Sequence, residues 1–319
     1  MKIEGPVPKV KSPSRTEFND EFMKPQKPVV IVGANRQWKA HSAWTLEYLR
    51  NKIGSNPIRV KQSATNLYPD LFSGIPVRHA EIELSEYIDL IASDAPDRNK
   101  KYLSGDETTI LSNYKVLNPI LAPLCEDFEP PEYCDREKIK TIGFWLSAQG
   151  VVASLHYDND GSHNLNIQVK GRKRVLLFPP HQGLYPFSGI NLFHGAQNFS
   201  QVNILHPDEA RFPAFRSAQC FEAVMEEGDM LFIPSYWYHA VFHEGQVNIN
   251  VNFWWQPEKF HLNKTSFRAT FLGLVQSALT GGKQFAEIRE VRAAMEKLPA
   301  ESRQLLQKIE DLIPQQYRI

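Results

Sequence analysis

Two histidines and one aspartate in this chain have the types and spacing of metal ligands. His156 and Asp158 flank Tyr157, and His239 follows later in an aromatic-rich segment. Side chains i and i+2 of a β-strand project from the same face, so His156 and Asp158 can reach one ion while Tyr157 points away. Two imidazoles and one carboxylate can occupy one face of an octahedral metal and leave the opposite face open, as in non-haem Fe(II) sites.

The spacing alone is weak evidence for a metal site, because the chain has a second His-x-Asp at His206, Pro207 and Asp208. Pro207 has no backbone N–H and breaks a strand ladder, so this copy predicts a turn or a helix start. The first copy follows the strand-like residues 150–152 and precedes a long alternating segment, which is the scaffold that a metal site needs. We therefore interpret the second copy as structural.

Composition and charge are those of an ordinary soluble enzyme. Of 319 residues, 42% are hydrophobic and 23% charged, which predicts one main domain with an appendage. Lys+Arg and Asp+Glu both number 36, so the zero net charge favours neither nucleic acid nor an anionic membrane as a partner.

The three cysteines lack the paired spacing of a zinc ribbon, which predicts free thiols at Cys125, Cys134 and Cys220. With no signal peptide or long apolar run, we expect a cytosolic protein.

Residues 1–135 are expected to mix helices with short strands that pack on a barrel. Residues 28–33 predict a short buried strand, and residues 101–104 another strand. Apolar residues at helical spacing predict amphipathic helices over residues 44–50 and 82–91.

Residues 136–257 are dominated by strand patterns and form the predicted core. Residues 164–169 alternate polar and apolar, residues 170–173 predict a turn, and residues 174–178 predict a returning strand, so the pattern indicates a hairpin with one wet face. Residues 247–254 alternate in the same way.

The polar positions of these strands are amides. They are Asn164, Asn166 and Gln168 in the first strand, and three asparagines in the later one. Such a face suits the lumen of a barrel, and many strands without intervening helices favour a double-sheet jelly roll. We therefore expect a mainly β fold with a double-stranded β-helix (jelly-roll, cupin) core, flanking N-terminal α/β elements and C-terminal helices.

Residues 258–319 change in composition. Residues 267–280 and 284–313 have helical periodicity with charged faces. Their apolar stripes exceed what a neighbouring barrel wall would cover, so we expect them to form a homodimer interface.

Five segments, taken together and in order, resemble motifs of the JmjC family of Fe(II)- and 2-oxoglutarate-dependent oxygenases. They are residues 150–158, 168–180, 228–234, 236–239 and 251–254. The resemblance extends over nearly the whole chain. Within the family it is to the hydroxylases similar to factor inhibiting hypoxia-inducible factor, and also to the hydroxylase of wybutosine in tRNA.

The resemblance implies iron as the metal and a dioxygenase reaction. His156, Asp158 and His239 match the iron ligands of the family. Fe(II), O2 and the co-substrate 2-oxoglutarate would then give a hydroxylated product with succinate and CO2, while the protein positions the substrate and excludes water.

The resemblance also implies a binding site for 2-oxoglutarate. Lys173 matches the cation that faces the distal carboxylate, where an ammonium makes a strong charge-assisted bond. Tyr102 matches a phenol that shares this carboxylate, and Asn164 and Asn252 match amides near the iron.

Two departures from the family pattern concern the site. Ala153 and Ser154 stand where relatives have a hydroxyl residue and a proline. Asn198 and Phe199 stand where the asparaginyl hydroxylase has a polar Arg-Gln pair that holds the target amide. A phenylalanine cannot donate to that amide, so the pattern does not favour asparagine as the target.

Three functions from different classes remain open. The first is a hydroxylase acting on a side chain of a protein or peptide. The second is a tRNA-base hydroxylase, which the zero net charge and Trp145, in place of an arginine of that enzyme, disfavour. The third is a cupin that binds metal without catalysis.

Overall fold

The computed structural model describes residues 1–75, 77–104, 108–112, 115–116, 121–158, 161–180 and 198–258. The C-terminal helices predicted over residues 267–280 and 284–313, and with them the predicted dimer interface, lie outside the described residues. No helix in the part that the structure describes is long and apolar enough to cross a membrane.

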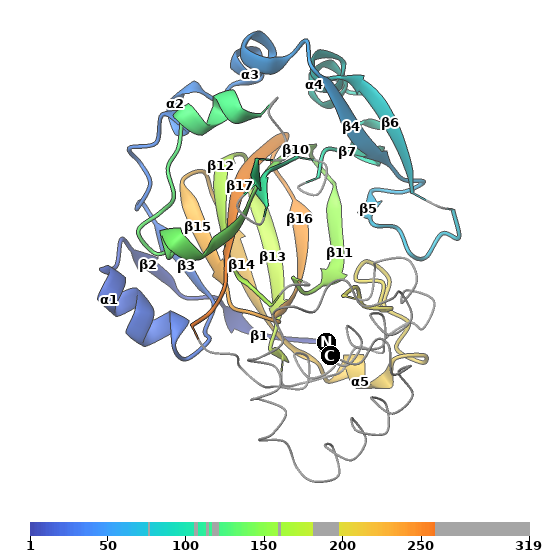
Figure 1. Cartoon of the computed structure of the whole chain (residues 1–319). Coiled ribbons are helices and arrows are strands. Elements are labelled where there is room, and N and C mark those ends of the chain that lie inside the picture. Colours follow the sequence, from blue (N-terminus) through green and yellow to red (C-terminus); the bar gives the residue numbers. More distant parts are fainter. Residues whose placement is uncertain are drawn as a thin grey trace, which may run out of the picture.

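The described strands form two large sheets and one small sheet (Figure 1). The first large sheet has the order β1 (Lys2–Pro6), β14 (Gln219–Met225), β13 (Lys173–Phe178), β16 (Tyr238–His243), β11 (Val152–His156) and β5 (Leu67–Tyr68). The second has the order β2 (Lys9–Lys11), β3 (Val29–Val32), β15 (Asp229–Ile233), β12 (His163–Lys170), β17 (Val247–Trp255), β10 (Ile139–Ala148), β8 (Thr109–Ser112) and β9 (Lys115–Val116). The small sheet has the order β6 (Arg78–Glu83), β4 (Pro57–Gln62) and β7 (Lys101–Tyr102).

Short helices join and flank these strands. The α-helices are α1 (Arg15–Phe18), α2 (Lys39–Ala43), α3 (Leu46–Ile53), α4 (Leu84–Ala92) and α5 (Pro213–Arg216). A π-helix, η1 (Asn19–Met23), follows α1, and 3₁₀-helices occur at η2 (Arg98–Lys100), η3 (Ala122–Glu126) and η4 (Arg136–Lys138).

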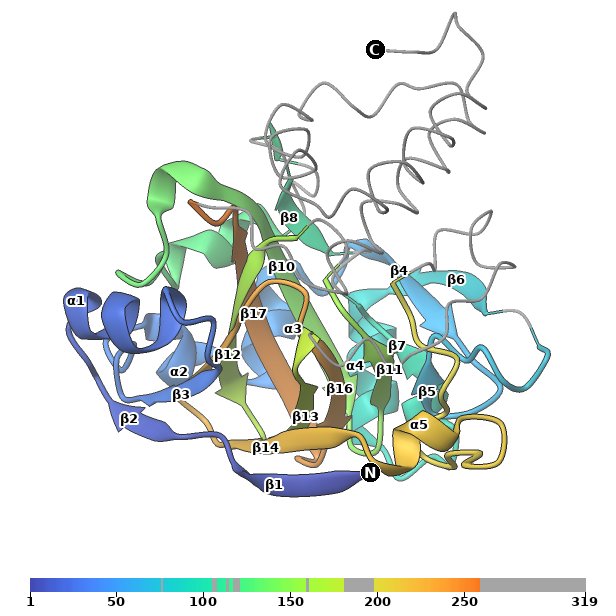
Figure 2. The same ribbon diagram turned by 90° about the horizontal axis from the view of Figure 1, so that it is seen from below.

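The two large sheets form the walls of a barrel, which confirms the predicted mainly β, jelly-roll class (Figures 1 and 2). Residues 1–32 contribute β1, β2 and β3 to these walls. Successive side chains of a strand point to opposite faces, so every second side chain of β12 faces out of the barrel. Leu165 and Ile167 of β12 pack there, in the large apolar core shared with the N-terminal helices. Trp44, just before α3, contacts Phe144 of β10 edge to face, with ring centroids 5.6 Å apart.

The predicted hairpin over residues 164–178 is wrong. β12 pairs with β15 and β17, whereas β13 pairs with β14 and β16, so the two strands belong to opposite walls. The turn at 170–173 therefore carries the chain across the barrel. This crossing directs the polar face of β12 and the side chain of Lys173 into the same lumen, which a hairpin would not do.

The N-terminal elements agree in type with the sequence patterns, although their boundaries shift by a few residues. β3 and β7 lie where strands were predicted, and α3 lies where the first helix was predicted. The predicted helix at 82–91 begins at Leu84 instead, because Ile82 and Glu83 pair with β4 as the end of β6.

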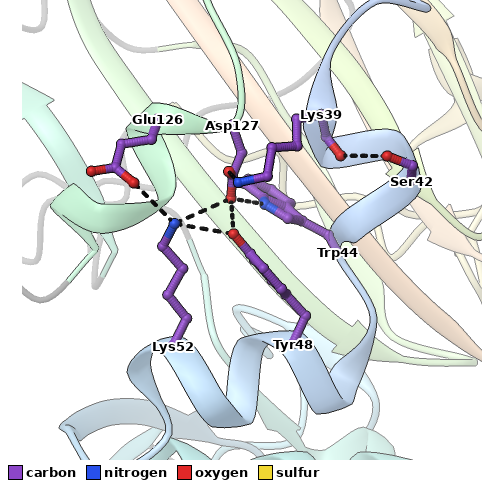
Figure 3. Close-up of polar contacts among 7 residues, drawn as sticks. All are labelled: Lys39, Ser42, Trp44, Tyr48, Lys52, Glu126 and Asp127. Carbon is purple, nitrogen blue, oxygen red and sulfur yellow. Dashed lines mark hydrogen bonds and ion pairs between the residues drawn. The ribbon is translucent and has the colours of Figure 1, made fainter.

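A buried carboxylate holds the N-terminal helices to the chain that leads into the barrel (Figure 3). The Asp127 side chain is 0% exposed, and its oxygens accept from Lys39 Nζ at 2.8 Å, Trp44 Nε1 at 2.9 Å and Tyr48 Oη at 2.7 Å. Lys52 Nζ lies 3.7 Å from the same carboxylate. Asp127 thus joins α2 and α3 to the segment after η3.

We expect Asp127→Asn to destabilise the fold at neutral pH. Burial alone would raise the pKa of this carboxyl, but the hydrogen bonds from Lys39, Tyr48 and Trp44 outweigh burial and lower it. The charged form therefore stabilises the fold above the unfolded pKa of about 3.9, and this contribution disappears as pH falls through the folded pKa. Urea unfolding at pH 7 should show a loss of about 3 kcal/mol, because a neutral amide leaves donors unpaired.

The same difference should shrink at pH 3. Glu126→Gln is the matched control, since its side chain is 75% exposed and should change stability by less than about 0.5 kcal/mol. An Asp127→Asn loss that is as large at pH 3 as at pH 7 would contradict this account.

Candidate metal and co-substrate site

The structure brings His156, Asp158 and His239 together at one end of the barrel lumen. Their ligand atoms all lie within 4.8 Å of one another. His156 ends β11 and pairs in register with His239 of β16, and the two imidazole centroids are 4.3 Å apart. β11 stops at His156, so Asp158 reaches the group from the loop beyond the strand. Tyr157 points into a separate apolar cluster, as the spacing predicted.

Backbone carbonyls orient both imidazoles for metal binding. His156 Nδ1 lies 2.6 Å from the Ser154 carbonyl oxygen, and His239 Nδ1 lies 3.0 Å from that of Trp237. When Nδ1–H donates to a carbonyl, the lone pair of Nε2 is free for a metal. Burial, helped by the neighbouring His239, lowers the pKa of His156 to about 4, so the imidazole is neutral at pH 7.

This donor set fits Fe(II). Two imidazoles and one carboxylate match the ligand types of facial non-haem iron sites. In the described part of the chain, no other group of three or more potential ligands is close enough to hold a metal ion. His206 and Asp208 are not brought to a site: Asp208 Oδ1 accepts from the backbone N–H groups of Ala210 and Arg211, which confirms its structural role.

A buried ammonium lies in the same lumen. Lys173, at the start of β13, is 1% exposed, and its Nζ donates to Asn250 Oδ1. Burial lowers the pKa of Lys173 well below the usual range, and no carboxylate within the described residues forms an ion pair with it. A buried charge without a counter-ion is costly, so this position is suited to receive an anion.

Three asparagines connect the two ends of the site. From Lys173, Asn250 Nδ2 donates to Asn252 Oδ1 at 2.6 Å, and Asn252 Nδ2 donates to Asn164 Oδ1 at 3.2 Å. Asn164 Nδ2 then donates to Asp158 Oδ2 at 3.0 Å. An ammonium can only donate and a carboxylate only accept, so the two ends determine the orientation of every amide between them.

Tyr102 lies at the Lys173 end of the lumen. Its ring is 5.8 Å from that of His243 and 5.1 Å from that of Tyr68. His243 is the cross-strand partner of Lys173 in the β13–β16 ladder. The structure therefore places Tyr102 near the cross-strand partner of Lys173, and its contact with a co-substrate stays a prediction.

Sequence reasoning missed Asn250 and His243. Burial and the nearby Lys173 lower the pKa of His243 to about 3, so at pH 7 this imidazole adds no charge beside the ammonium. The signals were present: Asn250 is two residues before Asn252, and His243 is four residues after His239, so each shares a strand face with a residue that was identified.

An aromatic side chain covers one imidazole of the cluster. The Phe199 ring stacks on the His156 imidazole, with centroids 5.0 Å apart and planes at 23°. Its neighbour Asn198 exchanges hydrogen bonds with the backbone of Tyr157: the side chain donates to the Tyr157 carbonyl at 2.7 Å, and the Asn198 carbonyl accepts from the Tyr157 N–H at 3.2 Å. Phe199 thus presents an apolar face beside the cluster.

We expect Gly161→Ala to weaken metal binding. Gly161 has φ +70°, and a Cβ there would lie 2.5 Å from Tyr236 Oη. Tyr236 also has a positive φ, 64°, and precedes His239 by three residues, so this contact joins the loop after Asp158 to the segment that carries His239. Mn(II) titration should show affinity lowered about 10-fold, the size of effect typical of groups that support metal ligands.

Gly74→Ala is the matched control. Gly74 has φ +71°, but a Cβ there would meet nothing within 4 Å. Both changes should cost about 1 kcal/mol of stability through backbone strain, and only Gly161→Ala should alter the metal site. Equal metal affinities for the two variants would refute the role given to Gly161.

Comparisons with known proteins give one domain family and relatives of two kinds. The cupin-like domain family matches residues 15–261. Lysine-specific demethylase 8 of Danio rerio is 31% identical over 262 residues, which cover 78% of this chain and 58% of the relative. The tRNA wybutosine-synthesizing protein 5 of Homo sapiens is 29% identical over 261 residues, covering 79% and 78%. The chain spans about half the length of the demethylase relatives it matches.

Proposed function

Because this chain belongs to the family of cupin-like domain proteins, we propose that it is an Fe(II)- and 2-oxoglutarate-dependent dioxygenase. One observation carries the proposal: the buried Lys173 ammonium shares a lumen and a hydrogen-bonded chain with the Asp158 carboxylate of the metal site. 2-Oxoglutarate matches this polarity, with a 2-oxo acid group suited to a metal at one end and a second carboxylate suited to an ammonium at the other.

Each part of the chain has a defined task in this proposal. His156, Asp158 and His239 hold the metal, and Lys173 neutralises the distal carboxylate of the co-substrate. When bound, iron supplies the O2 chemistry that couples conversion of 2-oxoglutarate into succinate and CO2 to hydroxylation of a C–H bond. Lys173, Asn250 and Asn252 are only 1–3% exposed between the two walls, where electrostatic interactions are stronger than in water.

A side chain of a protein or peptide is the substrate that we favour. The apolar face of Phe199 beside His156 suits the carbon chain of a residue, and the zero net charge offers no field for a polyanion. Several relatives are named lysine-specific demethylases, and that name specifies lysine as their target residue. Hydroxylation of an N-methyl group is chemically equivalent to the first step of demethylation, so both outcomes fit this proposal.

A tRNA base is the second candidate, because other relatives are named tRNA wybutosine-synthesizing proteins and match this chain at 29% and 27% identity. A metal-binding cupin without catalysis is the third, and the complete ligand set together with Lys173 argues against it.

Isotope labelling distinguishes the candidates. The purified chain with Fe(II), 2-oxoglutarate and ¹⁸O2 is incubated with a cell-derived peptide library or with bulk tRNA, and each product is analysed by mass spectrometry. We expect ¹⁸O in peptides after stable hydroxylation, or loss of a methyl group from methylated peptides after demethylation, with the same reaction of His156→Ala as the blank. Label found only in tRNA nucleosides would replace the protein substrate by the RNA base.

We also propose a cytosolic homodimer assembled through helices in residues 258–319, on the basis of their sequence pattern. Light scattering of the full chain at micromolar concentration should give twice the mass of the chain, and a monomer would contradict this assembly.

A further inference from the structure

The asparagine chain has one direction throughout. Asn250, Asn252 and Asn164 each point Oδ1 toward Lys173 and Nδ2 toward Asp158. The negative end of every amide dipole therefore faces the ammonium, and the positive end faces the carboxylate. All five groups lie in the lumen between two opposite walls, since Lys173 belongs to β13 and the asparagines belong to β12 and β17.

Asn250 occupies the decisive position in this chain. It is 1% exposed, and it is the one residue of β17 that accepts from the Lys173 ammonium. An ammonium has three donors, so a single amide acceptor directs Nζ and leaves donors for a ligand. A neutral amide also leaves the positive charge uncancelled, which a carboxylate at the same place would not.

We propose that Asn250 is a positioning residue for the co-substrate: it directs the Lys173 ammonium into the lumen, keeps its charge available to an anion, and sets the amide orientations of Asn252 and Asn164 toward the metal end. This inference rests on the proposed function, because it takes 2-oxoglutarate as the anion. It adds a residue that neither the motif pattern nor the metal cluster identifies.

Asn250→Asp tests the inference with an almost isosteric change. The new carboxylate would pair with Lys173 and cancel the charge that the co-substrate needs, and it would cease to donate to Asn252. We expect the dissociation constant of 2-oxoglutarate, measured by calorimetry on the Mn(II)-loaded full chain, to rise about 100-fold, the loss expected when a charge-assisted bond is removed. The KM for 2-oxoglutarate in succinate formation should rise by a similar factor, with kcat changing much less.

Two further variants control for burial of a carboxylate and for folding. Asn248→Asp places a carboxylate on the same strand and the same face, at a residue that is 0% exposed. Asn248 bonds the Gly245 carbonyl and Gln168 rather than Lys173, so 2-oxoglutarate affinity should stay within about 3-fold of the parent. Asn250→Ser keeps a group that can both accept and donate, and it should bind 2-oxoglutarate more tightly than Asn250→Asp by about 10-fold or more.

The possible results distinguish a failure of the proposed function from a failure of the role given to Asn250. If the parent protein with Mn(II) does not bind 2-oxoglutarate, the proposed function itself fails. If the parent binds but Asn250→Asp binds equally well, or Asn248→Asp loses as much affinity as Asn250→Asp, the proposed function stands and the role of Asn250 is overturned. If Asn250→Asp does not fold, a comparison of Asn250→Ser with Asn250→Ala decides. An affinity of Asn250→Ser for 2-oxoglutarate that equals that of the parent and is at least about 10-fold tighter than that of Asn250→Ala supports the positioning role of Asn250. Equal affinities of Asn250→Ser and Asn250→Ala overturn that role.

Discussion

Asp158→Ala should remove both metal binding and catalysis. Asp158 supplies the single carboxylate of the three-residue cluster, and its oxygen also accepts from Asn164 Nδ2. Without it, the two imidazoles supply no negative charge to balance a divalent ion, and the asparagine chain loses its acceptor. Mn(II) affinity should fall by more than about 100-fold, beyond the loss seen for groups that only support ligands. Succinate formation should fall to the level of the protein-free blank.

Asp208→Ala provides a control within the same chain. Asp208 has the same His-x-Asp spacing, but it is exposed and accepts only backbone N–H groups in the described structure. Its replacement should leave Mn(II) affinity and succinate formation at parental levels. Metal binding that survives in Asp158→Ala would mean that the cluster is not the metal site.

Lys173→Met should have the second-largest effect, and it should separate function from stability. Removing the ammonium should raise the KM for 2-oxoglutarate about 100-fold, which corresponds to about 3 kcal/mol of lost charge-assisted binding. Folding should not suffer. Because burial lowers the folded pKa of Lys173 below its unfolded value, the charged form costs stability at neutral pH, and an apolar side chain of similar size removes this cost. The change also leaves Asn250 Oδ1 without its donor, so the net change in stability should be small beside the loss of binding.

Two measurements check the expected effects of Lys173→Met on stability and on KM. Urea unfolding at pH 7 gives the stability, and initial rates at varied 2-oxoglutarate give KM. As control, Lys170→Met removes a lysine three residues earlier whose Nζ lies 3.6 Å from Glu227, and it should change stability by less than about 0.5 kcal/mol and leave KM unaltered. A Lys173→Met protein that keeps the parental KM would show that this ammonium does not bind the co-substrate.

The same ammonium predicts a pH dependence. Lys173 is charged below its lowered folded pKa and neutral above it. Affinity for 2-oxoglutarate should therefore decline with rising pH before an ordinary surface lysine begins to titrate.

The strands and the metal cluster could be predicted from the sequence because both depend on local periodicity. Alternation along residues 164–169 identified the face that lines the lumen, and the His156 and Asp158 spacing identified two members of the cluster that could hold a metal ion. Two-residue periodicity does not specify a strand's partner, however. The turn at 170–173 looks the same whether it closes a hairpin or crosses between sheets, and only the ladders of β12 and β13 decide.

The role of Asn250 could not be predicted from the sequence for a related reason. Its contact with Lys173 joins residues on opposite walls, far apart in sequence, and depends on the width of the lumen. Alternation could place Asn250 on the polar face but could not select it from Asn248, which bonds elsewhere. The helix boundary at Leu84 moved because pairing of β6 with β4 outweighed local helical periodicity.

Succinate formation is the most direct test of the central claim that this lumen is an Fe(II) and 2-oxoglutarate site. The purified full chain is incubated with Fe(II), ascorbate and 2-oxoglutarate in air, and succinate is quantified beside His156→Ala prepared in the same way. We predict succinate above the protein-free blank for the parent, none above it for His156→Ala, and none for the parent when Fe(II) is chelated. Equal succinate from parent and variant, or a parent that forms none with either peptide or tRNA substrates present, would contradict the account.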